Sequence, residues 1–212
     1  MLDVSKVRNK QKERPWYKPA LELIKKIKNG VSLDVGCGMG EFAILLKKRG
    51  FNVYCTDGSK RYVKNAENLG FNAKQTDFNN TLPFKDGFFD LVSCLEVIEH
   101  IENAENLIDE MRRVLKKKGY LLISTPNSAF LGSRIRALLG LPIADEGYHF
   151  RFFTYNSLIK LLKKNKFKIV SDNSISFLPF YLLTKKNPKA IKIKAWRNLL
   201  ASKCIILAKE GK

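Results

Sequence analysis

VSLDVGCGMGEF, at residues 31–42, is the most informative segment of this sequence. A short β-branched run carries an acid, Asp34, just before three glycines at alternate positions, Gly36, Gly38 and Gly40. A β-branched run that enters a glycine-rich turn is typical of the first strand of an open α/β sheet, where ligands lie at the carboxyl ends of the strands. The stretch therefore predicts a ligand-binding turn.

The spacing of the glycines separates two kinds of ligand. Dinucleotide-binding proteins have G-x-G-x-x-G, and the position of the third glycine is here Glu41. A pyrophosphate would be repelled by Asp34 and Glu41, whereas a ligand that carries an ammonium and a sulfonium would be attracted. We therefore expect a cationic nucleoside, with the glycines allowing close approach of the backbone.

A second acid supports a nucleoside ligand. Asp57 ends the next β-branched run and is followed by Gly58. A carboxylate in this place accepts hydrogen bonds from both ribose hydroxyls, in dinucleotide folds as well as in others. Asp57 therefore predicts a ribose but does not say which nucleoside.

Short β-branched runs alternate with helical patterns along most of the chain. The runs cover residues 31–35, 51–56, 90–95 and 119–125, with a weaker one at 71–77. The helical pattern at 103–119 has one apolar face and is expected to end at Gly119. Such alternation predicts an α/β fold, a parallel sheet with helices on both faces.

LDVGCGMGEF resembles motif I of the class I S-adenosylmethionine-dependent methyltransferases, and the resemblance to their ubiquinone-type branch covers nearly the whole chain. It implies a Rossmann-like, seven-stranded, mostly parallel sheet whose last strand is antiparallel. It also implies S-adenosyl-L-methionine as cofactor and S-adenosyl-L-homocysteine as product. The cofactor-binding residues that it implies are Asp34, Gly36, Cys37, Gly38, Gly40, Asp57, Gly58, Asp77, Phe78 and Leu95.

Three of these residues lie in the region 76–101, which resembles the following family motifs. Asp77 would bond the adenine amine, Phe78 would offer its backbone N–H and an apolar contact, and Leu95 would line the adenosine pocket. The branch usually has glycine where Lys166 stands, so we expect Asn165 to supply the left-handed helix cap.

Two histidines, His100 and His149, are the candidate catalytic residues, since a general base helps when the acceptor is a hydroxyl. A packed histidine is the alternative for each. Glu96, Glu99 and His100 would share one helix face and match a Glu-x-x-Glu-His string with which some ubiquinone-pathway O-methyltransferases hold a cation. A cap and an ion pair are the simpler interpretation, and we predict no metal.

The chain reads as a single domain, residues 1–212, with three additions. Residues 1–30 form a basic N-terminal helix region, and residues 178–200 a basic amphipathic segment that could rest on a membrane surface. Residues 126–153 are too long for an ordinary connection and predict a lid or substrate excursion with an apolar side. That side is expected to comprise Phe130, Ile135, Leu138 and Leu139.

Net charge and cysteine content indicate the cellular compartment and the kinds of partner to expect. The net charge is +19, and it lies on the flanks, since residues 31–159 are almost neutral. The N-terminus has no apolar signal-peptide core, and the four cysteines have no metal-ligand spacing, which predicts a cytoplasmic protein with reduced, buried thiols. Cys94 is expected to be buried and not a nucleophile.

These features predict a methyltransferase for a small-molecule acceptor, with the oxygen of a quinone, lipid-linked or sugar-derived compound as the expected target. An anionic membrane surface is a candidate partner. A nucleic-acid methyltransferase is the first alternative, but the string after residue 92 lacks the proline of base-amine methyltransferases. A nucleoside-binding protein without catalysis is the second.

Overall fold

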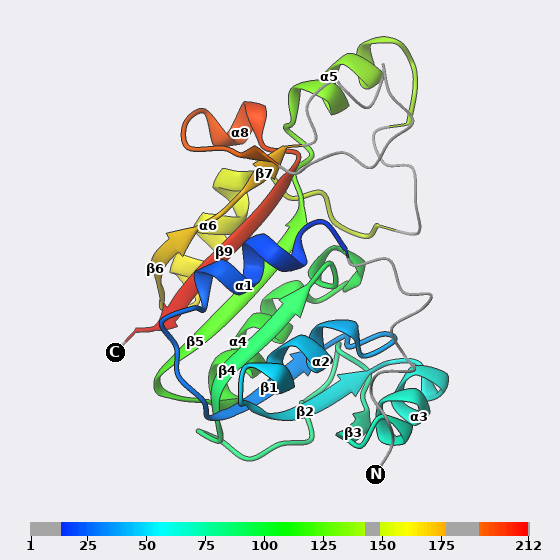
Figure 1. The fold of residues 1–212 in the computed structure, drawn as a ribbon. Helices are drawn as coiled ribbons and strands as arrows, with labels where there is room; N and C mark the ends of the chain where they lie inside the picture. The colour runs from blue at the N-terminus through cyan, green and yellow to red at the C-terminus, as the bar shows by residue number, and fades with distance from the viewer. Residues whose placement is uncertain (1–13, 143–148, 177–190, 212) are drawn as a thin grey trace.

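The computed structural model describes residues 14–142, 149–176 and 191–211, which form one mixed sheet with helices on both faces (Figure 1). The strands are β1 (Val31–Val35), β2 (Asn52–Asp57), β3 (Asn72–Gln75), β4 (Phe89–Leu95), β5 (Leu115–Pro126), β6 (Phe167–Asp172), β7 (Ile175–Ser176), β8 (Ile191–Lys192) and β9 (Lys203–Glu210). The helices are α1 (Tyr17–Leu23), α2 (Glu41–Lys48), α3 (Lys60–Asn68), the 3-10 turn η2 (Ile98–His100), α4 (Ala104–Val114), α5 (Leu131–Leu138), α6 (Tyr155–Lys164) and α8 (Arg197–Leu200).

The sheet has the order β3-β2-β1-β4-β5-β9-β7-β8, and β6 also pairs with β9. Strands β1 to β5 are parallel, and β9 runs antiparallel to both β5 and β6, which confirms the predicted antiparallel last strand. The described residues form nine strands where seven were expected. The additional pair, β7 and β8, has two residues each, too few for a hydrophobic pattern to reveal.

The strand order explains where a ligand can bind. The chain moves outward from β1 to β3 and then returns to place β4 on the other side of β1. The order therefore reverses between β1 and β4, and the loops that leave these two strands diverge and leave a crevice at their carboxyl ends. The glycine loop that follows β1 lies at this point.

Two apolar layers enclose the sheet. In Figure 1, α1 and α2 lie in front of the sheet and α4 and α6 behind it. Helix α4 begins where the Asn103 side chain accepts a hydrogen bond from the Asn106 backbone, and Leu107, Ile108 and Met111 are fully buried. Each such side chain stabilises the fold by roughly 1.5–3 kcal/mol through burial.

One helix end was predicted wrongly. The pattern at 103–119 predicted a helix that ends at Gly119, but α4 ends at Val114 and β5 begins at Leu115. The cause is a tertiary contact, since Leu115 is already in register with Phe89 of β4. Lys118 takes a positive φ of 68°, and the β4–β5 register shifts nearby.

A second cap also differs from its prediction. Asn165 is not left-handed (φ −88°), and Lys166 adopts that conformation instead, with φ 61°. The Asn165 side-chain amide donates to the Leu161 carbonyl 2.9 Å away and so stays in the last helical turn. Lys166 therefore occupies the left-handed position for which the resemblance led us to expect glycine. At the other end of α6, Thr154 and Ser157 form a capping box.

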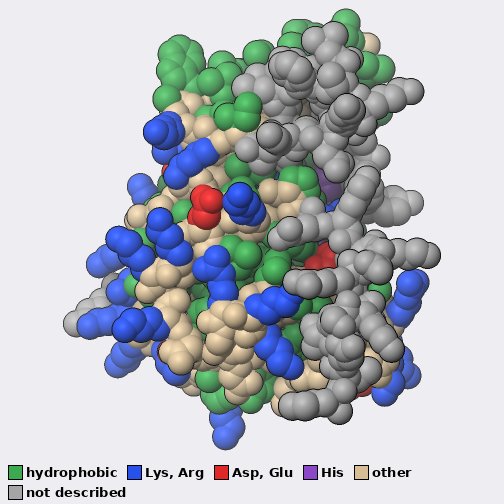
Figure 2. Space-filling model, in the orientation of Figure 1, with side chains coloured by type: hydrophobic (Ala, Val, Ile, Leu, Met, Phe, Trp, Pro, Cys, Tyr) green, Lys and Arg blue, Asp and Glu red, His purple; other side chains and the backbone are tan. Residues whose placement is uncertain are grey.

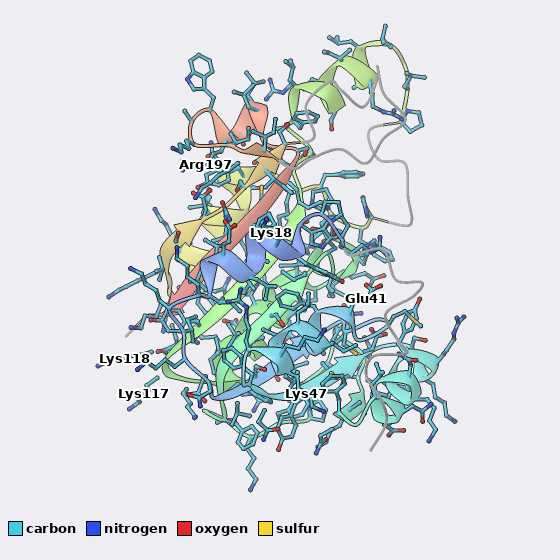
Figure 3. All side chains as sticks on the ribbon, in the orientation of Figure 1. Lys18, Glu41, Lys47, Lys117, Lys118 and Arg197 are labelled. Carbon is cyan, nitrogen blue, oxygen red and sulfur yellow. The ribbon has the colours of Figure 1, made fainter. Side chains whose placement is uncertain are left out.

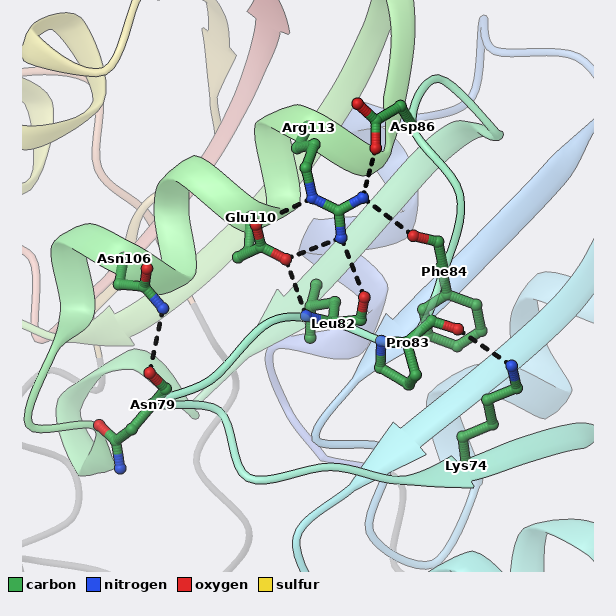
Figure 4. Close-up of polar contacts among 9 residues, drawn as sticks. All are labelled: Lys74, Asn79, Leu82, Pro83, Phe84, Asp86, Asn106, Glu110 and Arg113. Atoms are coloured by element: carbon green, nitrogen blue, oxygen red, sulfur yellow. Dashed lines mark hydrogen bonds and ion pairs between the residues drawn. The ribbon is translucent and has the colours of Figure 1, made fainter.

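The loop between β3 and β4 is fastened by one arginine of α4 (Figure 4). Arg113 donates hydrogen bonds to the carbonyls of Leu82 (2.9 Å) and Phe84 (3.0 Å) and pairs with Glu110 at 2.8 Å. Glu110 in turn accepts from the Leu82 backbone amide at 2.7 Å. This network holds the loop against the helix on the side of the sheet away from α1.

Lysine and arginine side chains are spread over the face that carries α1, while apolar side chains gather near α5 and α8 (Figure 2). Lys117 and Lys118 lie at the opposite end of the sheet from Glu41 (Figure 3). No helix in the described part of the chain is long and apolar enough to span a membrane. Residues 1–13 and 178–190 of the two predicted basic segments lie outside the described residues.

Candidate functional site

The glycine loop after β1 has the backbone that its sequence requires. Gly36, Gly38 and Gly40 all have positive φ, at 70°, 51° and 77°. Residues other than glycine adopt such φ angles only at a cost in free energy. The backbone amides of Gly36 and Cys37 both donate to the Thr56 carbonyl, at 2.8 and 3.1 Å. The loop is thus fastened to the end of β2, and α2 begins immediately after Gly40.

Two of these glycines face different surroundings. A Cβ atom built on Gly36 would lie 2.3 Å from the Val97 Cγ2 atom, so the loop packs too closely for any side chain there. A Cβ on Gly38 would meet nothing within 4 Å. Gly36 is therefore needed for packing, and Gly38 leaves its backbone open towards the cavity that both residues line.

Asp34 lies beneath this loop. Its residue is only 3% exposed, and the Ser93 hydroxyl donates a 2.7 Å hydrogen bond to its Oδ1 atom. Burial raises the pKa of Asp34 to about 7, against the opposing effects of Ser93 and of the Ala43 backbone at the start of α2. Asp34 does not line the cavity. Its predicted contact with a ligand ammonium stays a prediction, and what the structure shows is a carboxyl that joins β1, β4 and α2 under the loop.

Asp57 is held at the edge of the same loop. Its Oδ2 accepts from the Gly38 amide and its Oδ1 from the Ser59 amide, both at 2.9 Å. The carboxylate has lone pairs beyond these two bonds, which leaves it able to accept further donors. The structure therefore brings Asp57 and the glycine loop together as predicted, and its bond to a ribose stays a prediction. Gly58, next to it, is exposed.

A cavity of about 770 Å³ opens beside the loop, a size that ordinary small-molecule ligands occupy. Four of the predicted cofactor residues line it: Gly36, Cys37, Gly38 and Leu95. So do both predicted catalytic residues, His100 and His149. The remaining lining residues are Arg14, Trp16, Tyr17, Met39, Glu41, Tyr62, Glu96, Glu99, Pro126, Asn127, Ser128, Phe130, Ser133, Arg151, Phe152, Phe153, Ser202 and Lys203.

Asp77 and Phe78 lie away from the lining. The exposed Asp77 carboxylate accepts a 2.9 Å bond from the Asn79 backbone amide, and the side-chain amides of Asn79 and Asn80 also donate to it. Phe78 is 7% exposed and belongs to the core. These contacts hold the turn after β3, and the predicted roles of both residues towards adenine stay predictions.

S-adenosylmethionine fits what these residues offer. The open backbone at Gly38, the Asp57 carboxylate beside it and the apolar Leu95 are the groups that would meet its amino-acid, ribose and adenine parts. The lining contains acids (Glu41, Glu96 and Glu99) as well as basic residues (Arg14, Arg151 and Lys203), and Glu41, at the start of α2, is the acid that suits a positive charge on this ligand.

The acceptor side of the cavity holds the two histidines. The ring centroids of His100 and His149 are 4.8 Å apart, and the Phe152 ring lies 6.2 Å from that of His149. Burial, together with the neighbouring His100, holds the pKa of His149 below its usual value. His149 is therefore neutral at pH 7 and able to accept a proton.

The prediction that Glu96, Glu99 and His100 share one helix face is wrong. Only residues 98–100 are helical, as one 3-10 turn, and Glu96 has a left-handed backbone with φ 59°. The Ser124 hydroxyl donates to Glu96 Oε1 at 2.7 Å and the Thr125 hydroxyl to Glu99 Oε2 at 3.0 Å. Both acids still line the cavity, because β5 holds each of them.

The pKa of Glu99 is raised to about 8, first by burial and then by the charge of Glu96. Glu99 is thus largely protonated at neutral pH. One ligand atom each from Glu99, His100 and His149 lies within 4.8 Å of the others, a spacing compatible with a metal ion. The predicted absence of a metal stays untested. Glu96, the first acid of the Glu-x-x-Glu-His string, does not belong to this group, and its carboxylate is paired with Lys203.

Several lining residues were not predicted. Lys203 lies at the start of β9, and its ammonium pairs with Glu96 and stands 4.1 Å from the centroid of the Trp16 ring. The Tyr17 hydroxyl donates to Glu41 at 3.1 Å, and burial and Glu41 raise the pKa of Tyr17. The sequence does contain a signal for Lys203, because a lysine at the start of an apolar strand indicates a charge that needs a partner. Nothing in the sequence indicates that Trp16 and Tyr17, at the start of α1, line the cavity.

The excursion 126–153 is fastened at both ends of its described part. The Phe153 carbonyl accepts from the Ser128 amide (2.8 Å) and hydroxyl (3.0 Å), and the Arg151 amide donates to the Glu99 carbonyl at 3.1 Å. Between them, α5 has no buried residue. Of the four residues predicted for the apolar side of the excursion, Phe130 lines the cavity, and Ile135, Leu138 and Leu139 are exposed.

Comparisons with known proteins agree with the geometry. Residues 9–172 match the family model described as a methyltransferase domain. An uncharacterized protein of Methanocaldococcus jannaschii is 36% identical over 164 residues, which are 74% of this chain and 64% of that protein. A ubiquinone biosynthesis O-methyltransferase of Pelagibacter ubique is 31% identical over 167 residues, which are 72% of this chain and 68% of that protein.

The match is shorter for a second protein with that name, from Rickettsia typhi, which is 38% identical over 50% of this chain and 47% of its own length. The chain thus spans between about half and two thirds of the length of these curated relatives. Among solved structures, a methyltransferase of Thermotoga maritima superposes with a TM-score of 0.71 at 22% identity, over 92% of this chain and 89% of that one. This likeness shows the fold.

Proposed function

Because the chain belongs to the class I S-adenosylmethionine-dependent methyltransferases, we propose that it transfers a methyl group to an oxygen of a small molecule. A quinone-type phenol, a lipid-linked compound or a sugar-derived compound is the acceptor class. The observation that carries the proposal is that the glycine loop and the neutral His149 open onto one cavity. The names of the relatives, ubiquinone biosynthesis O-methyltransferases, support an oxygen acceptor.

S-adenosylmethionine, when bound, supplies an electrophilic methyl group on a sulfonium. The protein then has two tasks, to align the acceptor and to remove its proton. Trp16, Tyr17 and Phe153 line the cavity, and aromatic walls of this kind favour the exclusion of water once the ligands fill it, which strengthens electrostatic contacts and aids alignment. Alignment in a dry site can supply much of the acceleration, so no covalent intermediate with the protein is needed.

His149 is the candidate base for a hydroxyl acceptor. It lines the cavity, its lowered pKa leaves a ring nitrogen free to take a proton at pH 7, and its partner ring is His100. The protonated Glu99 nearby is a donor and not a competing base. A positioned base contributes typically about 10²–10⁴-fold to such a step.

An anionic membrane surface remains a proposed partner. Its support in the described residues comes from α5 and the residues after it, where Leu138 and Leu139 are 86% and 69% exposed, with Arg134 and Arg136 on the same helix. Apolar side chains between basic ones suit the interface of an anionic bilayer. A surface of this kind at the mouth of the cavity would bring a lipid-linked acceptor to the site.

The experiment is a transfer assay with isotopically labelled S-adenosylmethionine and matched acceptors. Catechol, aniline and thiophenol present an oxygen, a nitrogen and a sulfur on the same ring, and a structured RNA tests the nucleic-acid alternative. Mass spectrometry should find the label on the catechol oxygen. Label on nitrogen, sulfur or RNA instead would overturn the proposal. Binding of S-adenosylhomocysteine, measured by calorimetry, serves as the control for a folded cofactor site.

A further inference from the structure

The cavity contains a lysine whose burial requires a reason. Lys203 is 9% exposed as a residue and opens β9, where it pairs in register with Pro126 of β5. Lysine is rarely buried, because its ammonium must give up water, and it is then found paired. The surrounding β9 residues Cys204, Ile205 and Ile206 are fully buried and apolar, so a neutral side chain would suit the strand better.

Three elements hold this ammonium in place. Glu96, from the end of β4, forms the ion pair, and the ring of Trp16, just before α1, lies 4.1 Å from the Nζ atom. Glu96 is itself fixed by Ser124, and it is one of four residues other than glycine with positive φ in the described chain. A strained backbone that positions a charge is found most often at functional sites.

The arrangement leaves the ammonium able to bind a ligand. A lysine ammonium has three N–H donors, and Glu96 and the Trp16 ring face account for part of its surroundings. Lys203 lines the same cavity as His149 and the glycine loop. An acceptor that enters this cavity therefore meets a fixed positive charge on the wall formed by β9.

We propose that the Lys203 ammonium binds the ionised oxygen of the acceptor, so that the subsite takes a phenolate or a comparably acidic hydroxyl in its anionic form. This assignment rests on the proposed function and narrows its substrate class. Ionisation releases one proton, which His149 or solvent accepts, and the oxygen keeps its electron pair for bond formation to carbon. An aliphatic amine would enter as an ammonium and be repelled by Lys203, which disfavours that class of acceptor.

The test uses 4-nitrophenol, whose phenolate absorbs at a longer wavelength than the phenol, with protein saturated with S-adenosylhomocysteine so that no transfer occurs. At a pH where the free probe is mostly neutral, wild-type protein should shift the bound probe to the phenolate spectrum. Lys203→Met combined with Glu96→Gln, which removes both charges of the pair, should weaken phenolate binding by about 10–100-fold. The single variant Lys203→Arg, which keeps the positive charge, should retain most of the wild-type affinity for phenolate.

Lys209→Met is the matched control, because Lys209 lies on the same strand and also rests against an aromatic ring, Tyr120, but does not line the cavity. It should bind the probe like wild type. Unchanged affinity for S-adenosylhomocysteine and an unchanged melting temperature show that each variant is folded.

Three results would overturn the proposal. In the first, the probe fails to bind to wild-type protein or stays neutral when bound. In the second, the double variant binds phenolate as tightly as wild type, and in the third, EDTA abolishes the phenolate shift. The last would assign the positive charge to a metal ion at Glu99, His100 and His149. Because the readout is equilibrium binding, these results are independent of the transfer assay. Label on the catechol oxygen together with a neutral bound probe would leave the proposed function in place.

Discussion

The Ser93 hydroxyl donates a 2.7 Å hydrogen bond to Asp34 Oδ1 across the β1–β4 pair, directly beneath the glycine loop. Both residues are buried, and the pair joins the two strands between which the sheet order reverses. The bond therefore couples the loop that approaches the ligand to the core of the sheet.

Because of this pair, the free energy of unfolding should depend on pH. Asp34 has a pKa of about 7 in the folded chain against an ordinary value of 3.8, so between these pH values the folded chain holds a proton that the unfolded chain has lost. The free energy of unfolding therefore contains a component that falls as pH rises through this interval. Asp34→Asn should remove that component, as urea unfolding at several pH values would show.

Ser93→Ala should act in the opposite direction. The Ser93 hydrogen bond lowers the pKa of Asp34, so its loss raises that pKa further and extends the fall in stability above pH 7. The free energy of unfolding should drop by about 1–2 kcal/mol. Ser171→Ala, on the exposed part of β6, is the control and should change little. Equal pH profiles for Ser93→Ala and wild type would contradict this account.

Gly36→Ala should abolish cofactor binding. The added Cβ would lie 2.3 Å from Val97 at a backbone φ of 70°, so the loop must move. Gly87→Ala separates backbone strain from the steric clash, because Gly87 has a similar φ of 61° but a Cβ added there would have no atom within 4 Å. It should cost about 1–2 kcal/mol of stability and leave binding intact.

A second-site change checks the clash at Gly36 directly. Val97→Ala in the Gly36→Ala background should recover part of the affinity, measured calorimetrically with S-adenosylhomocysteine. No recovery would mean that strain at φ 70°, not contact with Val97, disables the loop.

Arg113→Met should destabilise the fold by about 2–4 kcal/mol, because it leaves two loop carbonyls and the Glu110 carboxylate without their donor. The side-chain hydrogen bond from Arg113 lowers the pKa of Glu110. The stability from this pair is therefore present above the ordinary carboxyl pKa and is lost as pH falls through the folded value. The difference between variant and wild type should shrink in acid.

Arg112→Met provides the comparison for Arg113. Its guanidinium approaches Asp109 only at 3.9 Å, with 31% and 56% of the two side chains exposed, and partly exposed pairs at this distance contribute about 0–1 kcal/mol. Thermal melts of the two variants should differ by several degrees. Equal melting temperatures would refute the role of Arg113 as the anchor of this loop.

His149→Ala tests the base. With catechol as acceptor, the variant should lose about 10²-fold in kcat near pH 7 and recover as pH rises, because the acceptor then ionises in solution. The wild-type rate should fall in acid as His149 takes up a proton, at a pH below the ordinary histidine value. A rate that is lowered equally at every pH would instead indicate a packing role for His149.

The sequence patterns correctly predicted those features that depend on residues close together in the chain. The strand at Val31–Val35 and the glycine loop follow from a β-branched run and from residues that alone tolerate positive φ, and the structure has both. The ion pair between Glu96 and Lys203 could not be predicted, since 107 residues separate its partners. The position of Trp16 and Tyr17 in the cavity lining depends likewise on tertiary packing. The end of α4 at Val114 was missed because strand pairing at Leu115 overrides a good helical pattern.

The exposed leucines of the excursion lead to the last prediction, which concerns the proposed membrane partner. Leu138→Ser with Leu139→Ser should reduce co-sedimentation with vesicles that contain anionic lipid by at least about 10-fold, since each leucine contributes on the order of 1.5–3 kcal/mol when buried in an apolar phase. Val170→Ser, at a half-exposed apolar residue of β6, should bind like wild type. Binding should also weaken as salt rises, because part of it comes from basic side chains. Wild-type protein that pelleted equally with neutral and anionic vesicles would contradict the electrostatic part of the proposal, and a double serine variant that pelleted like wild type would remove α5 from it.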